Sequence, residues 1–139
     1  MPADLCKSYV VRGLIMLHES YVSQKEKNIF RRWFQDEYFD LIVWYDIENK
    51  IIEGFQLCYD KNKDEHAFTW HRSAGFSHHK IDDSRALYRH PATPILVNDG
   101  VFPFDEIIQK FNSSSECIDK EIKDLVIEKM AEFSKMSLL

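Results

Sequence analysis

The sequence predicts an α+β fold: an antiparallel meander sheet of about four or five strands, C-terminal helices packed on one face, and an N-terminal helix. Two observations lead to this prediction. Three runs rich in large or β-branched side chains, at 40–46, 51–59 and 65–71, are separated by short polar turns. After Pro103 the apolar residues recur three and four positions apart, which is the helical period.

The whole chain, residues 1–139, is expected to form a single domain, because 139 residues is close to the commonest domain size. Aromatic residues make up 14% of the chain, enough to build a dense core at this length. Glycine and proline number four each, too few for a linker-rich chain.

The N-terminal region leaves helix and strand open as alternatives. Residues 5–21 carry apolar side chains three and four positions apart, which favours a helix. Their β-branched members would also tolerate a strand at 9–17. Residues 29–39 suit either a helix or an irregular aromatic segment.

The turns of the meander predict which side chains lie opposite one another. Residues 49–50 are taken as the first turn and residues 61–64 as the second loop. A slip of one residue would turn a strand over, so this assignment also fixes the two faces. It predicts a core face made of two cross-strand rows, Trp44–Phe55–Trp70 and Ile42–Leu57–Phe68.

After the meander, the sequence predicts a further strand within 76–83 and a short buried strand at 95–97. Pro103 opens a short helix, and a last helix is predicted to begin near 113–115, where Ser113 and Glu116 match a capping box. Both helices are amphipathic and are expected to cover one face of the sheet.

The other face of the predicted sheet would carry small and polar side chains. Gly54 would leave a gap between Tyr45 and His71, and a strand glycine can mark the close approach of a ligand or of backbone. The functional interpretation is a shallow pocket for a small polar ligand, lined by Tyr45, Gln56, Thr69 and His71. The alternative is that the N-terminal segment packs into the gap.

A second candidate site consists of potential ligands for a divalent metal. Imidazole and carboxylate groups suit zinc, manganese or iron. A strand or a helix over 77–83 would each place one His and one Asp together, and a third ligand could come from the third strand. The residues are His71, His78, His79, Asp82 and Asp83. The alternative is an exposed His-rich loop.

A thiol–imidazole pair is rejected by the predicted register. Cys58 faces Ala67, so His71 lies four residues further along the neighbouring strand. That offset corresponds to about 13 Å, beyond the reach of a nucleophile and its base. Three widely spaced cysteines without a CxxC pair suggest reduced thiols and a cytoplasmic location.

Charge and composition exclude two classes of partner. The net charge is −5 and no basic stripe is present, so nucleic acid is not expected to bind. No segment reaches membrane-spanning length. We expect a non-catalytic binding or interaction module that uses the semi-polar sheet face, with a small polar ligand or a protein partner, a homodimer included. The alternative is a small metal-dependent enzyme or metal-binding protein using His71 and residues 78–83.

Overall fold

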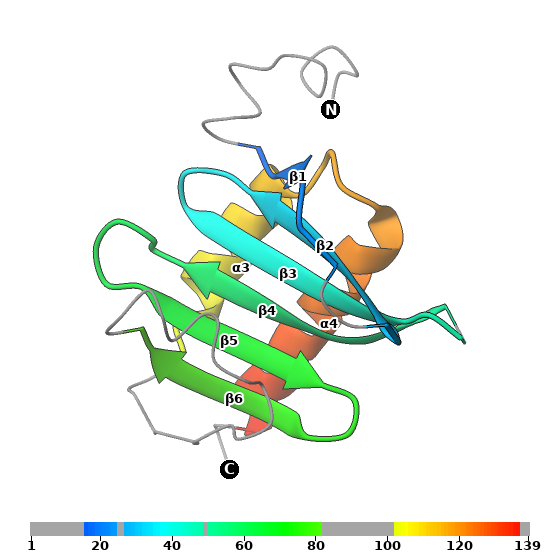
Figure 1. Cartoon of the computed structure of the whole chain (residues 1–139). Coiled ribbons are helices and arrows are strands. Elements are labelled where there is room, and N and C mark those ends of the chain that lie inside the picture. The colour runs from blue at the N-terminus through cyan, green and yellow to red at the C-terminus, as the bar shows by residue number, and fades with distance from the viewer. Residues whose placement is uncertain (1–15, 25–26, 49, 82–101, 137–139) are drawn as a thin grey trace.

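A computed structural model describes residues 16–24, 27–48, 50–81 and 102–136. Within these residues six antiparallel strands form one sheet in chain order (Figure 1). The predicted meander is confirmed, with six strands in place of four or five. The strands are β1 (His18–Ser20), β2 (Ile29–Gln35), β3 (Phe39–Asp46), β4 (Ile51–Tyr59), β5 (His66–His71) and β6 (Gly75–Lys80).

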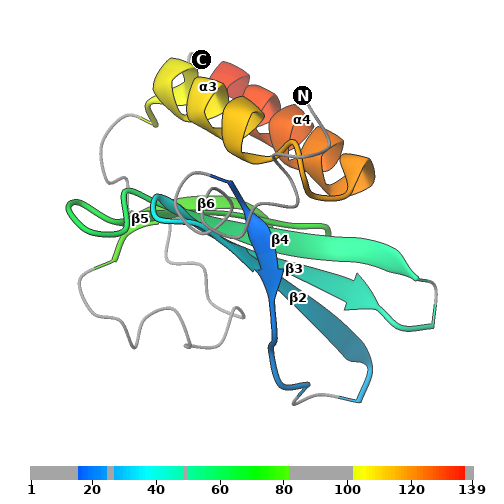
Figure 2. The same ribbon diagram turned by 90° about the horizontal axis from the view of Figure 1, so that it is seen from above.

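Two C-terminal helices, α3 (Phe104–Ser114) and α4 (Lys120–Met136), lie together over one face of the sheet (Figure 2). Each buries one stripe, with Ile107 and Phe111 on α3 and Val126 on α4 among the fully buried side chains. These stripes share one apolar core with Phe55 and Phe68 of the sheet. The predicted helical cover is therefore confirmed. Burying each large apolar side chain stabilises the fold by about 1.5–3 kcal/mol.

The predicted start of the last helix is wrong. Ser113 lies inside α3, and α4 begins only at Lys120. The amide of Ser115 donates to the carbonyl of Phe111, so the helical hydrogen bonds of α3 continue past the supposed capping box. The capping-box pattern also occurs inside helices, and here the α3 ladder overrides it.

The predicted register of the hairpin formed by β3 and β4 is also wrong, by one residue. Phe55 lies opposite Val43, and Trp44 lies opposite Gly54. Because side chains alternate along a strand, this slip places Val43 and its alternate residues on the helix-covered face and Trp44 on the other. The rows predicted through Trp44 and Ile42 therefore do not form.

The cause is a longer turn followed by a bulge. Asp46 pairs with Ile51, its carbonyl accepts the amide of Lys50 at 2.7 Å, and Lys50 adopts a positive φ of 56°. The register then shifts by one residue between Trp44 and Tyr45, so that Glu53 of β4 has no partner residue in β3. Such a bulge carries no strong sequence signature, so a turn placed at 49–50 could not anticipate it.

The hairpin formed by β4 and β5 has the predicted register, with Phe55 opposite Trp70 and Leu57 opposite Phe68. The strand predicted within 76–83 is β6. It follows a tight turn in which the amide of Ala74 donates to the carbonyl of His71 and Gly75 adopts a φ of 83°. Glycine adopts this backbone conformation without steric cost.

The N-terminal helix predicted over 5–21 is wrong where it can be compared, because His18–Ser20 forms strand β1. The ambiguous segment that begins at residue 29 is strand β2 as far as Gln35. Pairing with β3 along the full length of β2 decides the matter in favour of strand. Residues 1–15 and the strand predicted at 95–97 lie outside the described residues. No helix in the described part of the chain is long and apolar enough to cross a membrane.

Candidate functional site

The face of the sheet opposite α3 and α4 is called here the distal face. A continuous row crosses it from β1 to β6, because each member lies opposite the next in the strand pairing. This central row consists of Ser20, Trp33, Ile42, Gln56, Thr69 and Ser77. On either side of it run a row through His18, Gln35, Asp40, Cys58, Ala67 and His79 and a row through Arg31, Trp44, Gly54, His71 and Gly75.

Three of the four residues predicted to line a ligand pocket lie on the distal face. Gln56 and Thr69 face each other, and the Thr69 hydroxyl donates to Oε1 of Gln56 at 3.4 Å. The amide nitrogen of Gln56 donates to Sγ of Cys58, also at 3.4 Å. His71 lies one row away, with Nδ1 2.9 Å from the hydroxyl oxygen of Ser73. All three side chains are partly exposed.

Tyr45, the fourth predicted lining residue, lies on the helix-covered side. It pairs with Ile52, and its ring packs against the apolar core. Its hydroxyl oxygen accepts a hydrogen bond from Nη1 of Arg32 at 3.4 Å, and burial raises its pKa. The one-residue slip of the first hairpin separates Tyr45 from Gln56.

The gap expected beside Gly54 is closed by backbone. A Cβ atom on Gly54 would lie 2.6 Å from the carbonyl oxygen of Trp70 and 3.1 Å from Cα of His71. Of the two expectations for a strand glycine, the close approach of a neighbouring strand is the one observed. The distal face is therefore continuous at this point.

The three histidines of the predicted metal site do not converge. His78 points into the helix-covered core, where Nε2 lies 2.6 Å from the hydroxyl oxygen of Tyr59. His71 and His79 share the distal face, but they pair with Gly75 and Ala67 and so lie four residues apart along the ladder. Among the described residues no group of three His, Cys, Asp or Glu side chains could hold a metal. Asp82 and Asp83 lie outside the described residues.

The surroundings of His78 were not anticipated from the sequence. Its ring stacks on that of His66, with centroids 5.2 Å apart, and lies edge-on to Phe102 at 5.4 Å. Tyr59 stacks on both imidazoles. These contacts join three strands and a segment before α3, so no local sequence signal could have revealed them. They make His78 a core residue.

Cys58 does not have the properties of a nucleophile. It is 1% exposed, and burial raises the pKa of its thiol to about 12. Its partner in the ladder is Ala67, whereas His71 pairs with Gly54, so the rejection of a Cys58–His71 pair is confirmed. The thiolate is the nucleophilic form of cysteine, and at neutral pH this side chain holds its proton.

Cys117 contradicts the expectation of three reduced thiols. It is disulfide-bonded, and Cys58 is the free cysteine of the described residues. Its spacing from the other cysteines gave no sign of this, because disulfide connectivity depends on the fold and not on sequence separation.

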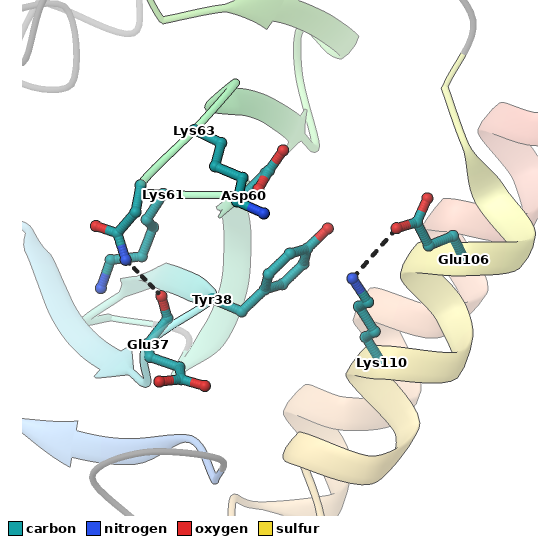
Figure 3. Close-up of a pocket in the computed structure, with 8 residues that line it drawn as sticks. Glu37, Tyr38, Asp60, Lys61, Lys63, Glu106 and Lys110 are labelled. Carbon is teal, nitrogen blue, oxygen red and sulfur yellow. Dashed lines mark hydrogen bonds and ion pairs between the residues drawn. The ribbon is translucent and has the colours of Figure 1, made fainter.

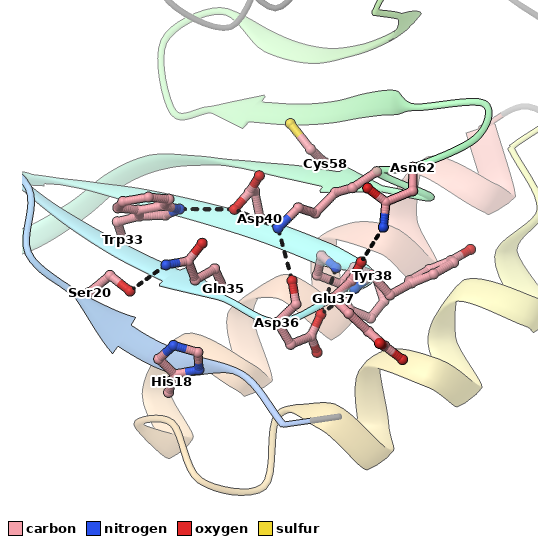
Figure 4. A network of polar contacts seen from close by, with 12 residues as sticks. His18, Ser20, Trp33, Gln35, Asp36, Glu37, Tyr38, Asp40, Cys58 and Asn62 are labelled. Carbon is pink, nitrogen blue, oxygen red and sulfur yellow. Dashed lines mark hydrogen bonds and ion pairs between the residues drawn. The ribbon is translucent and has the colours of Figure 1, made fainter. Parts of the chain in front are cut away.

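Sequence reasoning also missed a polar network at one end of the distal face (Figure 4). Nε1 of Trp33 donates to Oδ1 of Asp40 at 3.0 Å, and Nζ of Lys61 lies 3.4 Å from the same oxygen. Lys61 also donates to the carbonyl of Asp36 at 2.8 Å. The network holds one edge of the Trp33 indole in place, leaving its partly exposed ring on the distal face.

The distal face combines apolar and hydrogen-bonding side chains. It combines the partly exposed apolar side chains of Trp33, Ile42 and Trp44 with the hydrogen-bonding pair Gln56 and Thr69. Searches for similar proteins among family models, curated proteins and solved structures gave no significant match to this chain.

Proposed function

We propose that this protein is a non-catalytic interaction module that binds a partner protein through the distal face of its sheet. The observation that carries the proposal is the position of Trp33, Ile42 and Trp44. All three lie on the face away from the helices, and all three are partly exposed. Tryptophan is the residue type most enriched among side chains that dominate binding energy at protein interfaces.

The arrangement of these side chains favours a protein over a small ligand. Trp33 and Ile42 are direct neighbours across β2 and β3, and Trp44 follows on the same face of β3. In β4 the neighbour of Trp44 is Gly54, which has no side chain to cover the indole. Gln56 and Thr69 lie beside these three partly exposed side chains, and interfaces combine apolar centres with polar groups in this way.

Two further observations support a module without catalysis. The free thiol of Cys58 is buried and protonated. Of the histidines of the predicted metal site, His78 points into the core, whereas His71 and His79 lie in separate rows of the distal face. The alternative, a metal-dependent enzyme or metal-binding protein, is thus supported by fewer residues than the sequence suggested. Elemental analysis of untagged protein tests it, and one bound metal per chain that is lost with His71→Ala or His79→Ala would revive it.

Location and oligomeric state are separate predictions. A cytoplasmic location no longer draws support from the cysteines, because Cys117 is disulfide-bonded and such bonds persist in oxidising compartments. A homodimer would be one form of the proposed interaction, with a second copy as the partner. Binding to nucleic acid or to membranes stays outside the proposal, as the net charge of −5 suggests.

The proposal is tested by site-specific photo-crosslinking in the cells that produce the protein. A photoreactive phenylalanine analogue replaces Ile42 or Trp44 on the distal face, or Met136, which is 54% exposed at the end of α4, as the control. We expect both distal-face positions to capture the same protein, identified by mass spectrometry, and the control position not to capture it. Capture of a second copy from both positions would identify the partner as this chain itself.

The captured protein is then purified and its affinity for the wild type and for Trp44→Lys is measured by calorimetry. Loss of a central interface tryptophan costs about 2 kcal/mol or more, which corresponds to at least a 30-fold weaker complex. Met136→Lys, which adds the same charge on the other side, should bind like the wild type. Equal binding by wild type and Trp44→Lys, or capture from Met136 alone, would overturn the proposal.

A further inference from the structure

A cleft of about 370 Å³ lies at one end of the sheet, where the β2–β3 turn, the β4–β5 turn and α3 meet (Figure 3). None of its described lining residues belongs to the three rows of the distal face, and Lys61 alone also takes part in the polar network beside Trp33. Its volume is within the range of sites that hold small molecules or single side chains. Six of its described lining residues are charged.

Two walls of the cleft are tied to each other. Asn62 of the β4–β5 turn reaches the carbonyl of Glu37 in the β2–β3 turn at 3.5 Å. Lys61 donates to the carbonyl of Asp36 at 2.8 Å. The turn that carries Asp60 is closed by a hydrogen bond from the amide of Lys63 to the carbonyl of Asp60 at 3.2 Å. The side chains that project from these turns therefore start from a fixed backbone.

The ring of Tyr38 already holds an ammonium group. Nζ of Lys110 lies 4.1 Å from the centre of this ring and 3.2 Å from Oε1 of Glu106. The Lys110 side chain is 47% exposed, so this contact competes with water. Burial raises the pKa of Tyr38, which keeps its ring neutral. An aromatic face next to carboxylates is a favourable environment for an organic cation.

The six charged lining residues are three carboxylates and three ammonium groups, and their ion pairs decide which of them stay unpaired. Lys61 pairs with Asp40 outside the cleft, and Lys110 pairs with Glu106 inside it. Glu37, Asp60 and Lys63 then have no ion pair with any described residue. Two unpaired carboxylates therefore face one unpaired ammonium, and this balance favours a cationic ligand over an anionic one.

We propose that this cleft binds an alkylammonium group, carried either by a free diamine or by a lysine side chain of a peptide. The ammonium group lies between the Tyr38 ring and Asp60, with its alkyl stem along the ring. Lys110 is the internal competitor for the ring, and Lys63 opposes the incoming charge.

The test is a titration of the ¹⁵N-labelled protein, followed by amide chemical shifts at low salt. The cationic probes are 1,4-diaminobutane and N-acetyl-lysine methylamide, which distinguish a free amine from a peptide lysine. The anionic probes are acetate and inorganic phosphate. We expect both amines to give saturable shifts at millimolar concentration, confined to the turns around Tyr38 and Asp60 and to the first half of α3, whereas the anions give none.

Variants that remove single charges test whether negative charge in the cleft strengthens amine binding and positive charge weakens it. Asp60→Asn should weaken amine binding about two- to fivefold, the effect of one exposed charge pair. Asparagine also tolerates the positive φ of 58° at this position, so the turn is expected to persist. Lys63→Gln and Lys110→Gln should each tighten binding by a similar factor. Glu128→Gln, an exposed charge change on α4, is the matched control and should leave it unchanged.

Three results would overturn the proposal. The first is the absence of saturable shifts with either amine. The second is tighter binding of phosphate or acetate than of the amines at the same residues. The third is an equal effect of Glu128→Gln and Asp60→Asn, which would mean that the amines respond only to net charge. Each result leaves the distal-face proposal untouched, because none of these residues lies on that face.

Discussion

Gly54 shows how a single residue constrains the sheet. Its missing Cβ would lie 2.6 Å from the carbonyl oxygen of Trp70, a backbone atom in the neighbouring strand that cannot move without disturbing the ladder. We expect Gly54→Ala to lower the free energy of unfolding by about 1–3 kcal/mol. Chemical denaturation measures this change.

The comparison variant is Gly75→Ala. Gly75 has a φ of 83°, but a Cβ there meets no atom within 4 Å. Only the backbone cost of about 1–2 kcal/mol applies at this position. The backbone amide chemical shifts should also respond differently. Gly54→Ala should change them in both β4 and β5, whereas Gly75→Ala should change them only in the turn. A Gly54→Ala protein as stable as the wild type would show that the two strands can separate at little cost.

Asp36 gives a pH dependence with a defined sign. Its Oδ1 accepts the amides of Tyr38 at 2.8 Å and Phe39 at 2.6 Å. Burial nevertheless raises the pKa of this carboxyl group above its ordinary value. The folded state therefore binds this proton more tightly than the unfolded state. Its contribution to stability is fully present below the unfolded pKa and is lost as the pH rises through the folded pKa.

We therefore expect Asp36→Asn, which keeps the acceptor oxygen without the charge, to be more stable than the wild type near neutral pH. The difference should shrink as the pH falls toward about 4. Asp36→Ala should instead lose about 1–3 kcal/mol, because two amides lose their acceptor. Urea denaturation at several pH values measures all three proteins. A constant difference between Asp36→Asn and wild type across this range would contradict the prediction.

At the scale of elements, Arg32 connects the sheet to the start of α4. Its guanidinium contacts Glu19 of β1 and Asp119 before α4, each at 2.7 Å, and its side chain is 19% exposed. We expect Arg32→Leu to lower the free energy of unfolding by about 1–2 kcal/mol, because two charge-assisted hydrogen bonds are lost. The loss stays small because both carboxylates are well exposed and are solvated by water once released. Denaturation measures the overall loss.

Hydrogen exchange gives the local prediction for the same variant. Amides of β1 and of the first turn of α4 should exchange faster in Arg32→Leu, while those of α3 should keep their wild-type rates. Lys120→Gln, which breaks a pair between exposed side chains on α4, should change neither quantity measurably. Uniformly faster exchange in all elements would show that Arg32 has no specific role at α4.

The elements that could be predicted are those with a strong local period. Strands β3 to β6 and helix α3 lie close to where alternation and helical spacing placed them. Strand β2 was ambiguous because its aromatic and charged residues fit either period, and only pairing with β3 decides it. The start of α4 was misplaced because a capping pattern is weaker than the continued hydrogen bonds of α3.

The candidate site was predicted in part for the same reason. Gln56, Thr69 and His71 share a face because the β4–β5 hairpin has the predicted register. Tyr45 was assigned to that face only through the β3–β4 hairpin, where a four-residue turn and a bulge change the register by one. Because a one-residue change inverts a whole strand, a small local error exchanged the faces of Tyr45 and Trp44.

At the scale of the whole molecule, the two faces of the sheet differ in the side chains that they carry. The helix-covered face holds the aromatic core, with Phe55, Phe68 and Phe111 fully buried. The distal face carries the partly exposed tryptophans and the polar pair next to them. The large aromatic side chains are therefore buried mainly on one side, while the distal face buries smaller residues such as Cys58 and Ala67.

The thiol of Cys58 can report how often the sheet opens, because this residue lies near the centre of the sheet and is 1% exposed. Its side chain projects from the distal face, so a reagent reaches the thiol only when the groups that cover it move apart or when the protein unfolds. We expect negligible alkylation of Cys58 in the native protein. The labelling rate is followed by mass spectrometry at several denaturant concentrations. Its logarithm should rise with denaturant concentration with the same slope as the equilibrium constant of global unfolding. Gly54→Ala should raise the logarithm of that rate in proportion to its loss of free energy of unfolding, and Gly75→Ala should do so in proportion to its own.

Cys117 provides the internal comparison in the same experiment. Because it is disulfide-bonded, it should resist alkylation even in the denatured protein and react only after reduction. Peptide mapping distinguishes it from Cys58, which should react on unfolding alone. Rapid labelling of Cys58 at a rate independent of denaturant would mean that the groups covering its thiol move apart locally, and the distal face would then be a mobile surface. Slow labelling that follows global unfolding would instead make it a preformed one, so that partner binding requires no prior rearrangement of the sheet.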